Sequence, residues 1–130
     1  IIQLHGDESP EYCAQLGGRI FKAFRLKDAE TIKRFADYAP TITLLLDTYV
    51  KGKAGGTGKQ IDNNLLDQIT DFSRVVLAGG IAAKHIIPLH QRYQPFGFDI
   101  NSSIEASPGI KDHKKMRLLF QTIKNKNEHE

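Results

Sequence analysis

The first candidate for chemistry is Asp47, a carboxylate that directly follows the apolar run at 42–46. Such a run is typical of a buried strand, so Asp47 is expected at the mouth of that strand. Partial loss of water there favours the protonated carboxyl, which suits the group to giving or taking protons. The alternative is a helix cap or a salt-bridge partner. Because a glycine-rich segment follows, the pattern favours a catalytic acid or base.

Two turns that follow consecutive apolar runs form the second candidate. They read Leu77-Ala78-Gly79-Gly80-Ile81 and Asn101-Ser102-Ser103-Ile104-Glu105. Glycine lets a ligand approach the backbone, and exposed amides at a helix start attract phosphate. In (β/α) barrels the loops after strands seven and eight often hold phosphate in this way. Two ordinary turns are the alternative, and the repetition on consecutive strands favours phosphate binding.

A third segment, Ala54-Gly55-Gly56-Thr57-Gly58-Lys59-Gln60, invites comparison with a nucleotide-binding P-loop. That motif needs a glycine where this chain has Lys53, and a serine or threonine where it has Gln60. The comparison therefore fails. A mobile loop that covers a substrate is the better interpretation, with a plain linker as the alternative.

His5 lies beside Gly6 and Asp7 at the end of the first apolar run. It could contact a substrate, and a hydrogen-bonded core histidine is equally open. The single cysteine, Cys13, cannot form an internal disulfide, and no CxxC or histidine-rich spacing suggests zinc. The sequence therefore predicts no metal site and no redox role.

Short apolar runs alternate with helix-type stretches, which is the pattern of parallel βα units. Strands are predicted at 1–5, 20–24, 41–46, 75–78 and 98–100. Five such units in one domain, residues 1–130, make an α/β fold. They could form a doubly wound open sheet or most of a (β/α)8 barrel of the TIM type. Both architectures place active sites at the carboxyl edge of the strands.

Capping residues and apolar spacing place the helices. Ser9-Pro10 is an N-cap followed by proline at the first helical position, and Asp28 caps the next helix. Pro88 falls inside the fourth helical pattern and predicts a short or distorted helix. The side chains expected to face inward are Ile32, Phe35 and Ala36, then Leu65, Leu66, Ile69 and Phe72, then Met116, Leu119, Phe120 and Ile123.

Composition excludes some classes of function. The chain has 130 residues, 40% of them hydrophobic, and a formal charge of +3. The lysines near its end form the solvated side of an amphipathic helix, and no aromatic residues interleave with them to stack on bases, so no nucleic acid is predicted. No apolar run reaches the roughly 18 residues that a membrane span needs. A cytoplasmic location is expected.

The chain resembles the phosphoribosylanthranilate isomerase family over its whole length. The ordered motifs that carry the resemblance are Gln3-Leu4-His5-Gly6-Asp7-Glu8, Lys22-Ala23-Phe24, Leu45-Leu46-Asp47, Gly55-Gly56-Thr57-Gly58-Lys59, Leu77-Ala78-Gly79-Gly80, Asp99-Ile100-Asn101-Ser102-Ser103-Ile104-Glu105 and Pro108-Gly109-Ile110-Lys111-Asp112. Each motif is weak alone, whereas the ordered set is specific.

The resemblance implies strands four to eight of the barrel and an enzyme of tryptophan biosynthesis that performs an Amadori rearrangement without a cofactor. Asp47 matches the general acid at the end of strand six, which protonates the ribose ring oxygen. His5 and Asp99 match positions near the substrate. The residues that match the phosphate-holding loops are Gly79, Gly80, Ser102 and Ser103.

The departures from the family are informative. Its general base is a cysteine in a Lys-Ile-Cys-Gly-type motif at the end of strand one, and an arginine after strand two contacts the anthranilate carboxylate. Neither segment occurs among these residues. Cys13 lies in a helix beside Tyr12 and Leu16 and is expected to be a small buried thiol rather than that base. Ser103 replaces the glycine usual in its loop.

The chain begins at Ile1 without an initiator methionine, in what looks like the middle of a strand, and a fragment of a longer chain is therefore expected. The expected partners are a phosphorylated small molecule and either an N-terminal barrel segment or a second copy of the chain. Such a piece is expected to be inactive alone. Two alternatives are a non-catalytic phosphate-binding remnant or interaction module, and another phosphate-binding barrel enzyme.

Overall fold

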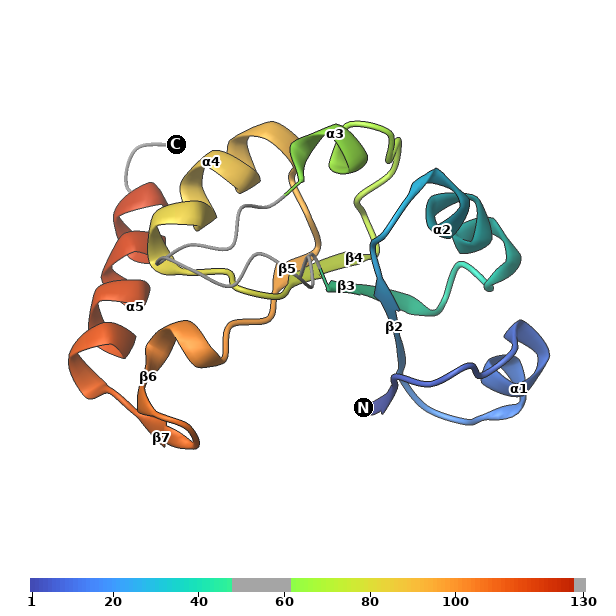
Figure 1. The fold of residues 1–130 in the computed structure, drawn as a ribbon, viewed down its shortest axis with the longest axis horizontal. Helices are drawn as coiled ribbons and strands as arrows, with labels where there is room; N and C mark the ends of the chain where they lie inside the picture. Colours follow the sequence, from blue (N-terminus) through green and yellow to red (C-terminus); the bar gives the residue numbers. More distant parts are fainter. Residues whose placement is uncertain (48–61, 128–130) are drawn as a thin grey trace.

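The computed structural model describes residues 1–47 and 62–127 of the chain, and its centre is a sheet of five parallel strands (Figure 1). The strands are β1 (Ile2–Leu4), β2 (Ile20–Arg25), β3 (Thr43–Asp47), β4 (Val75–Ala78) and β5 (Gly97–Phe98). Each strand pairs in parallel with the next one along the chain. The five predicted strands are confirmed, with small shifts at their ends.

The order of the strands decides between the two architectures that the sequence left open. Doubly wound sheets reverse their strand order at a switch point. Here the spatial order β1-β2-β3-β4-β5 is the order in the sequence, without a reversal among the described strands. Since right-handed crossovers then all place their helices on the same face, this is the order of a barrel rather than of a doubly wound sheet.

The two faces of the sheet carry separate apolar clusters. On one face, residues such as Leu44, Leu46 and Leu77 join the helices in the larger core. On the other face, Leu45, Val76 and Ala78 form a small buried cluster against Phe21 and Ala23. Because successive side chains of a strand point to opposite faces, this small cluster marks the inner face of the sheet.

Five α-helices occur among the described residues: α1 (Pro10–Gln15), α2 (Ala29–Lys33), α3 (Asn63–Leu66), α4 (Ala83–Tyr93) and α5 (His113–Asn127). The predicted caps form. The Ser9 hydroxyl accepts the amide of Tyr12 at 3.2 Å, and the Asp28 carboxylate accepts the amide of Thr31 at 2.9 Å. In the described part of the chain, no helix is both long and apolar enough to cross a membrane.

Helix α3 is shorter than its apolar pattern predicts. It ends at Leu66, yet Ile69 and Phe72 are still buried, as expected. The reason is local, because Asp71 accepts the amide of Ser73 at 2.8 Å and so stabilises a turn in place of further helix. The apolar side chains therefore reach the core from an irregular segment.

One other expectation about the helices is wrong, and for another, one of its two alternatives is excluded. Ala36 was expected to face inward and is exposed, because Arg34–Asp37 forms the 3-10 helix η1, whose tighter winding moves Ala36 off the buried side. Helix α4 runs for 11 residues through Pro88 and is not short. Pro88 and Lys84 are both exposed, so water can satisfy the carbonyl of Lys84 that loses its amide partner.

The final helix, α5, buries a narrower stripe than predicted. Leu119 is buried and Met116 is half-buried, whereas Phe120 is 62% exposed and Ile123 is 37% exposed. Among the described elements, α5 packs mainly on α4 and on the 3-10 turn η2 (Ser102–Ile104), which cover only one side of it. A hairpin of β6 (Glu105–Ser107) and β7 (Ile110–Lys111), expected to be a loop, precedes α5.

Arg74 joins the segments that start β3 and β4 at the amino edge of the sheet. Its guanidinium donates to the carbonyls of Phe35 at 2.8 Å, Ala39 at 2.8 Å, Tyr38 at 3.1 Å and Ile42 at 3.3 Å. These carbonyls lie just before β3 in the chain. The contacts therefore fix where β3 begins and, through the strand, where Asp47 ends it.

Candidate active site

Asp47 is the last residue of β3 and lies on the inner face of the sheet. The register pairs Asp47 with Arg25 on β2 and with Ala78 on β4, and Ala78 belongs to the inner apolar cluster. Asp47 is half-buried, and its backbone carbonyl accepts the amide of Leu26 at 3.1 Å. The arrangement places a carboxylate and a guanidinium on neighbouring strands at the carboxyl edge. The catalytic role of Asp47 stays a prediction.

The first glycine turn has a backbone that side chains rarely tolerate. Gly79 has φ 78° and Gly80 has φ 69°, both in the left-handed region. This turn and the one after β5 line a cavity of about 140 Å³, whose wall consists of Gly79, Gly80, Ile81, Asp99, Asn101 and Ser102. The structure thus brings together most of the residues predicted to hold phosphate, with Asp99 beside them. Their binding of phosphate stays a prediction.

Ser103 takes a different place from its neighbour Ser102. Its hydroxyl donates to the carbonyl of Ile81, so the side chain ties the two turns together and does not line the cavity. Asn101 does line it; it belongs to the turn predicted from the sequence but was assigned no role of its own. The ammonium of Lys111 donates to the carbonyl of Asn101 at 3.1 Å and to Glu105 at 2.9 Å.

Charged and polar side chains contact the backbone of the two turns. The hydrogen bond from Lys111 holds the pKa of Glu105 below its ordinary value. His85 is half-buried and accepts the amide of Ala82 on Nδ1 at 3.1 Å. Burial, with the nearby charge of Lys84, lowers the pKa of His85. A neutral imidazole therefore caps α4 just after the glycine turn.

At the other end of the sheet, a buried lysine fixes the turn that follows β1. Lys22 on β2 is 2% exposed, and its ammonium donates to the carbonyl of Gly6 at 2.8 Å and contacts Glu8 at 3.2 Å. The carboxylate of Glu8 in turn accepts the amide of Gly6 at 3.0 Å. This network sets the position of His5. Its sequence signal was a lysine inside the apolar run at 20–24, which was not assigned a role.

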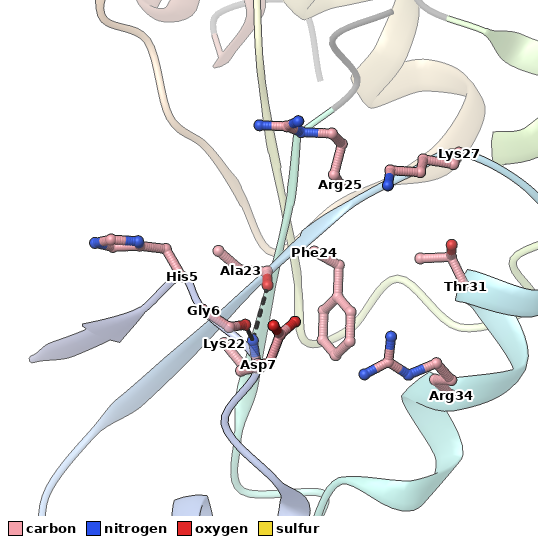
Figure 2. A pocket seen from close by; sticks show the side chains of 10 residues that line it. All are labelled: His5, Gly6, Asp7, Lys22, Ala23, Phe24, Arg25, Lys27, Thr31 and Arg34. Carbon is pink, nitrogen blue, oxygen red and sulfur yellow. Dashed lines mark hydrogen bonds between the residues drawn. The ribbon is translucent and has the colours of Figure 1, made fainter.

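His5 itself is exposed and makes no hydrogen bond within the described residues, which excludes a hydrogen-bonded core histidine there. It lines a second cavity, of about 330 Å³, at the ends of β1 and β2. Figure 2 shows this cavity around the Phe24 ring, with Asp7 on one side of the ring and Arg34 on the other. Arg25 lines both this cavity and the inner edge beside Asp47.

Cys13 lies in α1 and is 1% exposed, as expected for a small buried thiol. Burial raises the pKa of this thiol, which disfavours the thiolate that a base would need. No group of three or more histidine, cysteine, aspartate or glutamate side chains in the described ranges could hold a metal ion. The predicted substrate-covering loop at 54–60 lies outside the described residues.

Fold and site together define an α/β protein with barrel-type strand order, whose polar and glycine residues gather at the carboxyl edge of its parallel strands. A family model described as N-(5'phosphoribosyl)anthranilate (PRA) isomerase matches residues 1–122. The chain belongs to that family.

Individual members of this family match the chain as well. The N-(5'-phosphoribosyl)anthranilate isomerase of Acaryochloris marina is 41% identical over 128 residues, which is 94% of this chain and 59% of the relative. The crystal structure of the Thermotoga maritima enzyme matches with a TM-score of 0.77 at 30% identity, over 95% of this chain and 60% of the other. The chain therefore spans about 60% of the length of the relatives it matches.

A further solved structure holds a ligand. It is a phosphoribosyl anthranilate isomerase in complex with reduced 1-(o-carboxyphenylamino)-1-deoxyribulose 5-phosphate. It matches with a TM-score of 0.71 at 26% identity and covers 95% of this chain and 58% of its own. That ligand carries both a phosphate and a carboxylate.

Proposed function

We propose that this chain supplies strands four to eight of an N-(5'-phosphoribosyl)anthranilate isomerase barrel, as one domain spanning residues 1–130. The observation that supports this best is the match of the family model to residues 1–122. The sequential strand order, the glycine turn after β4 and the serine-containing turn after β5 support assignment to the last strands of such a barrel. The reaction converts an aminoaldose into an aminoketose in tryptophan biosynthesis, in the cytoplasm.

In this proposal Asp47 is the general acid. A proton from its carboxyl goes to the ribose ring oxygen, the bond from that oxygen to C1 breaks, and the nitrogen lone pair forms the C1–N double bond of a Schiff base. A base then removes the proton on C2, and the resulting enolamine becomes the ketone by proton transfer to C1. No outside oxidant is needed, because C1 is reduced as C2 is oxidised. Asp47 suits the first step because it stands half-buried at the end of a buried strand.

The phosphate of the substrate would lie in the 140 Å³ cavity, which Gly79, Gly80 and Ser102 line. Left-handed glycines let a phosphate approach the backbone amides without a Cβ in the way. Ser103 contributes by fixing the two turns through its bond to Ile81, and its own amide remains a candidate donor. His5 and Asp99 would contact the sugar or the aromatic part from the two ends of the sheet.

The base that takes the C2 proton would come from a segment that completes the barrel. Cys13 does not suit this role, because it is buried in α1 and its pKa is raised. The chain alone is therefore proposed to be inactive. Its partners are the phosphorylated substrate and the completing barrel segment or, failing that, a second copy of the chain.

An isomerase assay tests the proposal. The 130-residue chain is assayed alone and mixed with a polypeptide that carries the missing barrel strands. Activity is expected only in the mixture. Asp47→Asn should lower kcat by at least about a hundredfold, because removing a general acid typically costs 10² to 10⁴.

Asp37→Asn is the matched control, since Asp37 is an exposed aspartate on η1 at the opposite edge of the sheet. It should leave kcat unchanged. Full activity of Asp47→Asn in the mixture would remove Asp47 from the mechanism. Inactivity of every mixture, with association of the two parts demonstrated by ultracentrifugation, would favour a non-catalytic phosphate-binding module instead.

A further inference from the structure

The cavity at the ends of β1 and β2 has an excess of positive charge. Arg25, Lys27 and Arg34 all line it, and Asp7 is the acidic side chain in the wall. Within the described residues, none of the three cations lies in an ion pair with an acidic side chain. Like charges around one cavity repel each other, so an anion bound between them would reduce this repulsion.

The neighbouring acids are engaged elsewhere. The carboxylate of Asp28 caps α2 and accepts both the amide and the hydroxyl of Thr31 at 2.9 Å. Glu30 pairs with Lys33 at 2.5 Å on the exposed side of α2. Glu8 is held by Lys22 and by the amide of Gly6. Lys27 acts on Asp28 only through its charge, and Arg34 also interacts with Tyr38, so both cations keep N–H groups for a further acceptor.

The wall of the cavity is a built surface rather than a set of exposed chains alone. Lys22, which is almost fully buried, fixes the Gly6 carbonyl and so sets the wall at the end of β1. The guanidinium carbon of Arg34 lies 5.9 Å from the centre of the Phe24 ring, and Figure 2 shows the Arg34 side chain beside this ring. Planar guanidinium groups match the geometry of carboxylate and phosphate oxygens.

We propose that this cavity binds a small anion with a phosphate or carboxylate group, at a site separate from the cavity between the turns after β4 and β5. Its volume of about 330 Å³ lies at the lower end of the range for small-molecule sites, roughly 300 to 1,000 Å³. The two cavities share no lining residue. Since His5 lines this one, the bound anion lies next to a residue proposed to contact the substrate.

The test is a titration of the full ¹⁵N-labelled chain with inorganic phosphate and, separately, with benzoate, followed by nuclear magnetic resonance. The Nε–H signals of Arg25 and Arg34 and the amide of Thr31 report on this cavity, and the amides of Gly79 and Gly80 report on the other. Saturable shifts of the first group are expected. The anion that binds more tightly identifies the preferred chemistry.

Arg34→Gln and Lys27→Gln should each weaken binding at this cavity by about threefold to tenfold and leave the Gly79 and Gly80 titration unchanged. Lys33→Gln removes the same charge from the opposite side of α2 and should change neither. Lys27→Gln is the safer variant for folding, because Lys27 is exposed. The proposal is overturned if neither anion moves the first group, or if all three variants weaken binding equally. Loss of isomerase activity plays no part in this readout, so the two proposals fail separately.

Discussion

Two arginines at opposite edges of the same sheet are used in contrasting ways. Arg74, at the amino edge, donates to the carbonyls of four residues and is saturated by the protein itself. Arg25, at the carboxyl edge, has no such partner among the described residues and borders a cavity beside Asp47. In barrel folds the amino edge serves stability and the carboxyl edge serves function. The hydrogen bonds of Arg74 and the position of Arg25 at a cavity agree with that division.

Substitution at the amino edge should give the largest change in stability. Arg74→Met leaves four carbonyls without their shared donor and should lower the free energy of unfolding by about 3 kcal/mol, since hydrogen bonds to charged groups contribute roughly 1.5 to 3 kcal/mol. Urea unfolding measures the change. Arg25→Met is the matched variant and should stay within about 0.5 kcal/mol of wild type. Equal losses in the two variants would contradict the division between the edges.

Lys22 is an exception to this division, because it is a buried cation close to the carboxyl edge of the sheet. Lys22→Met should lower the free energy of unfolding by about 2 kcal/mol, as the Gly6 carbonyl and the partly exposed Glu8 lose their partner. The double variant with Glu8→Gln should cost less than the sum of the two single changes. Strict additivity in denaturant unfolding would show that the pair is not coupled.

A substitution in the glycine turn should change stability through the backbone conformation rather than through charge. Gly80→Ala forces an L side chain into φ 69° and should cost about 1 kcal/mol of stability, with weaker phosphate binding in the same variant. Gly17→Ala is the control, because a Cβ there meets nothing within 4 Å and its φ is not left-handed. Thermal unfolding compares the two. A Gly80→Ala protein as stable as Gly17→Ala would argue against strain in the turn.

The smallest expected effect is a pH dependence that involves His85. Burial lowers its pKa in the folded protein from the ordinary 6.5, so the unfolded chain binds the proton more readily. The stability that neutral His85 contributes is therefore present above about pH 6.5 and is lost as the pH falls through the folded pKa. The free energy of unfolding is measured at pH 7.5 and at pH 5. Its decrease between these two pH values should be slightly smaller in His85→Gln than in wild type. An identical pH dependence in both proteins would contradict the shift.

The sequence predicted what depends on local chemistry and missed what depends on long-range packing. The five strands, the caps at Ser9 and Asp28, and the burial of Cys13 all follow from short patterns. Phe120 fits a helical stripe equally well, but its burial depends on which elements pack against α5, and the described ones leave it exposed.

The residues of the candidate site likewise fall into those that the sequence predicted and those that it missed. The glycine and serine turns could be predicted from the sequence, because the backbone conformation of a turn restricts the residue types that can occupy it. Arg25 and Lys22 were not, because a cation in or after a strand has no fixed meaning until its partners are known. Only the register shows that Arg25 lies opposite Asp47. Only the network shows that Lys22 is a fixed part of the wall.

The strand order has a consequence for how the molecule assembles. Every strand in the sheet hydrogen-bonds to the strand directly before or after it in the chain, so no pairing waits for a distant segment. Each pairing therefore closes a loop of only one βα unit, which limits the entropy cost of closing it and lets neighbouring units add to the sheet in turn. Synthesis on the ribosome delivers those units in the order in which they pair. The chain can therefore build its sheet progressively as it emerges, one βα unit docking on the last.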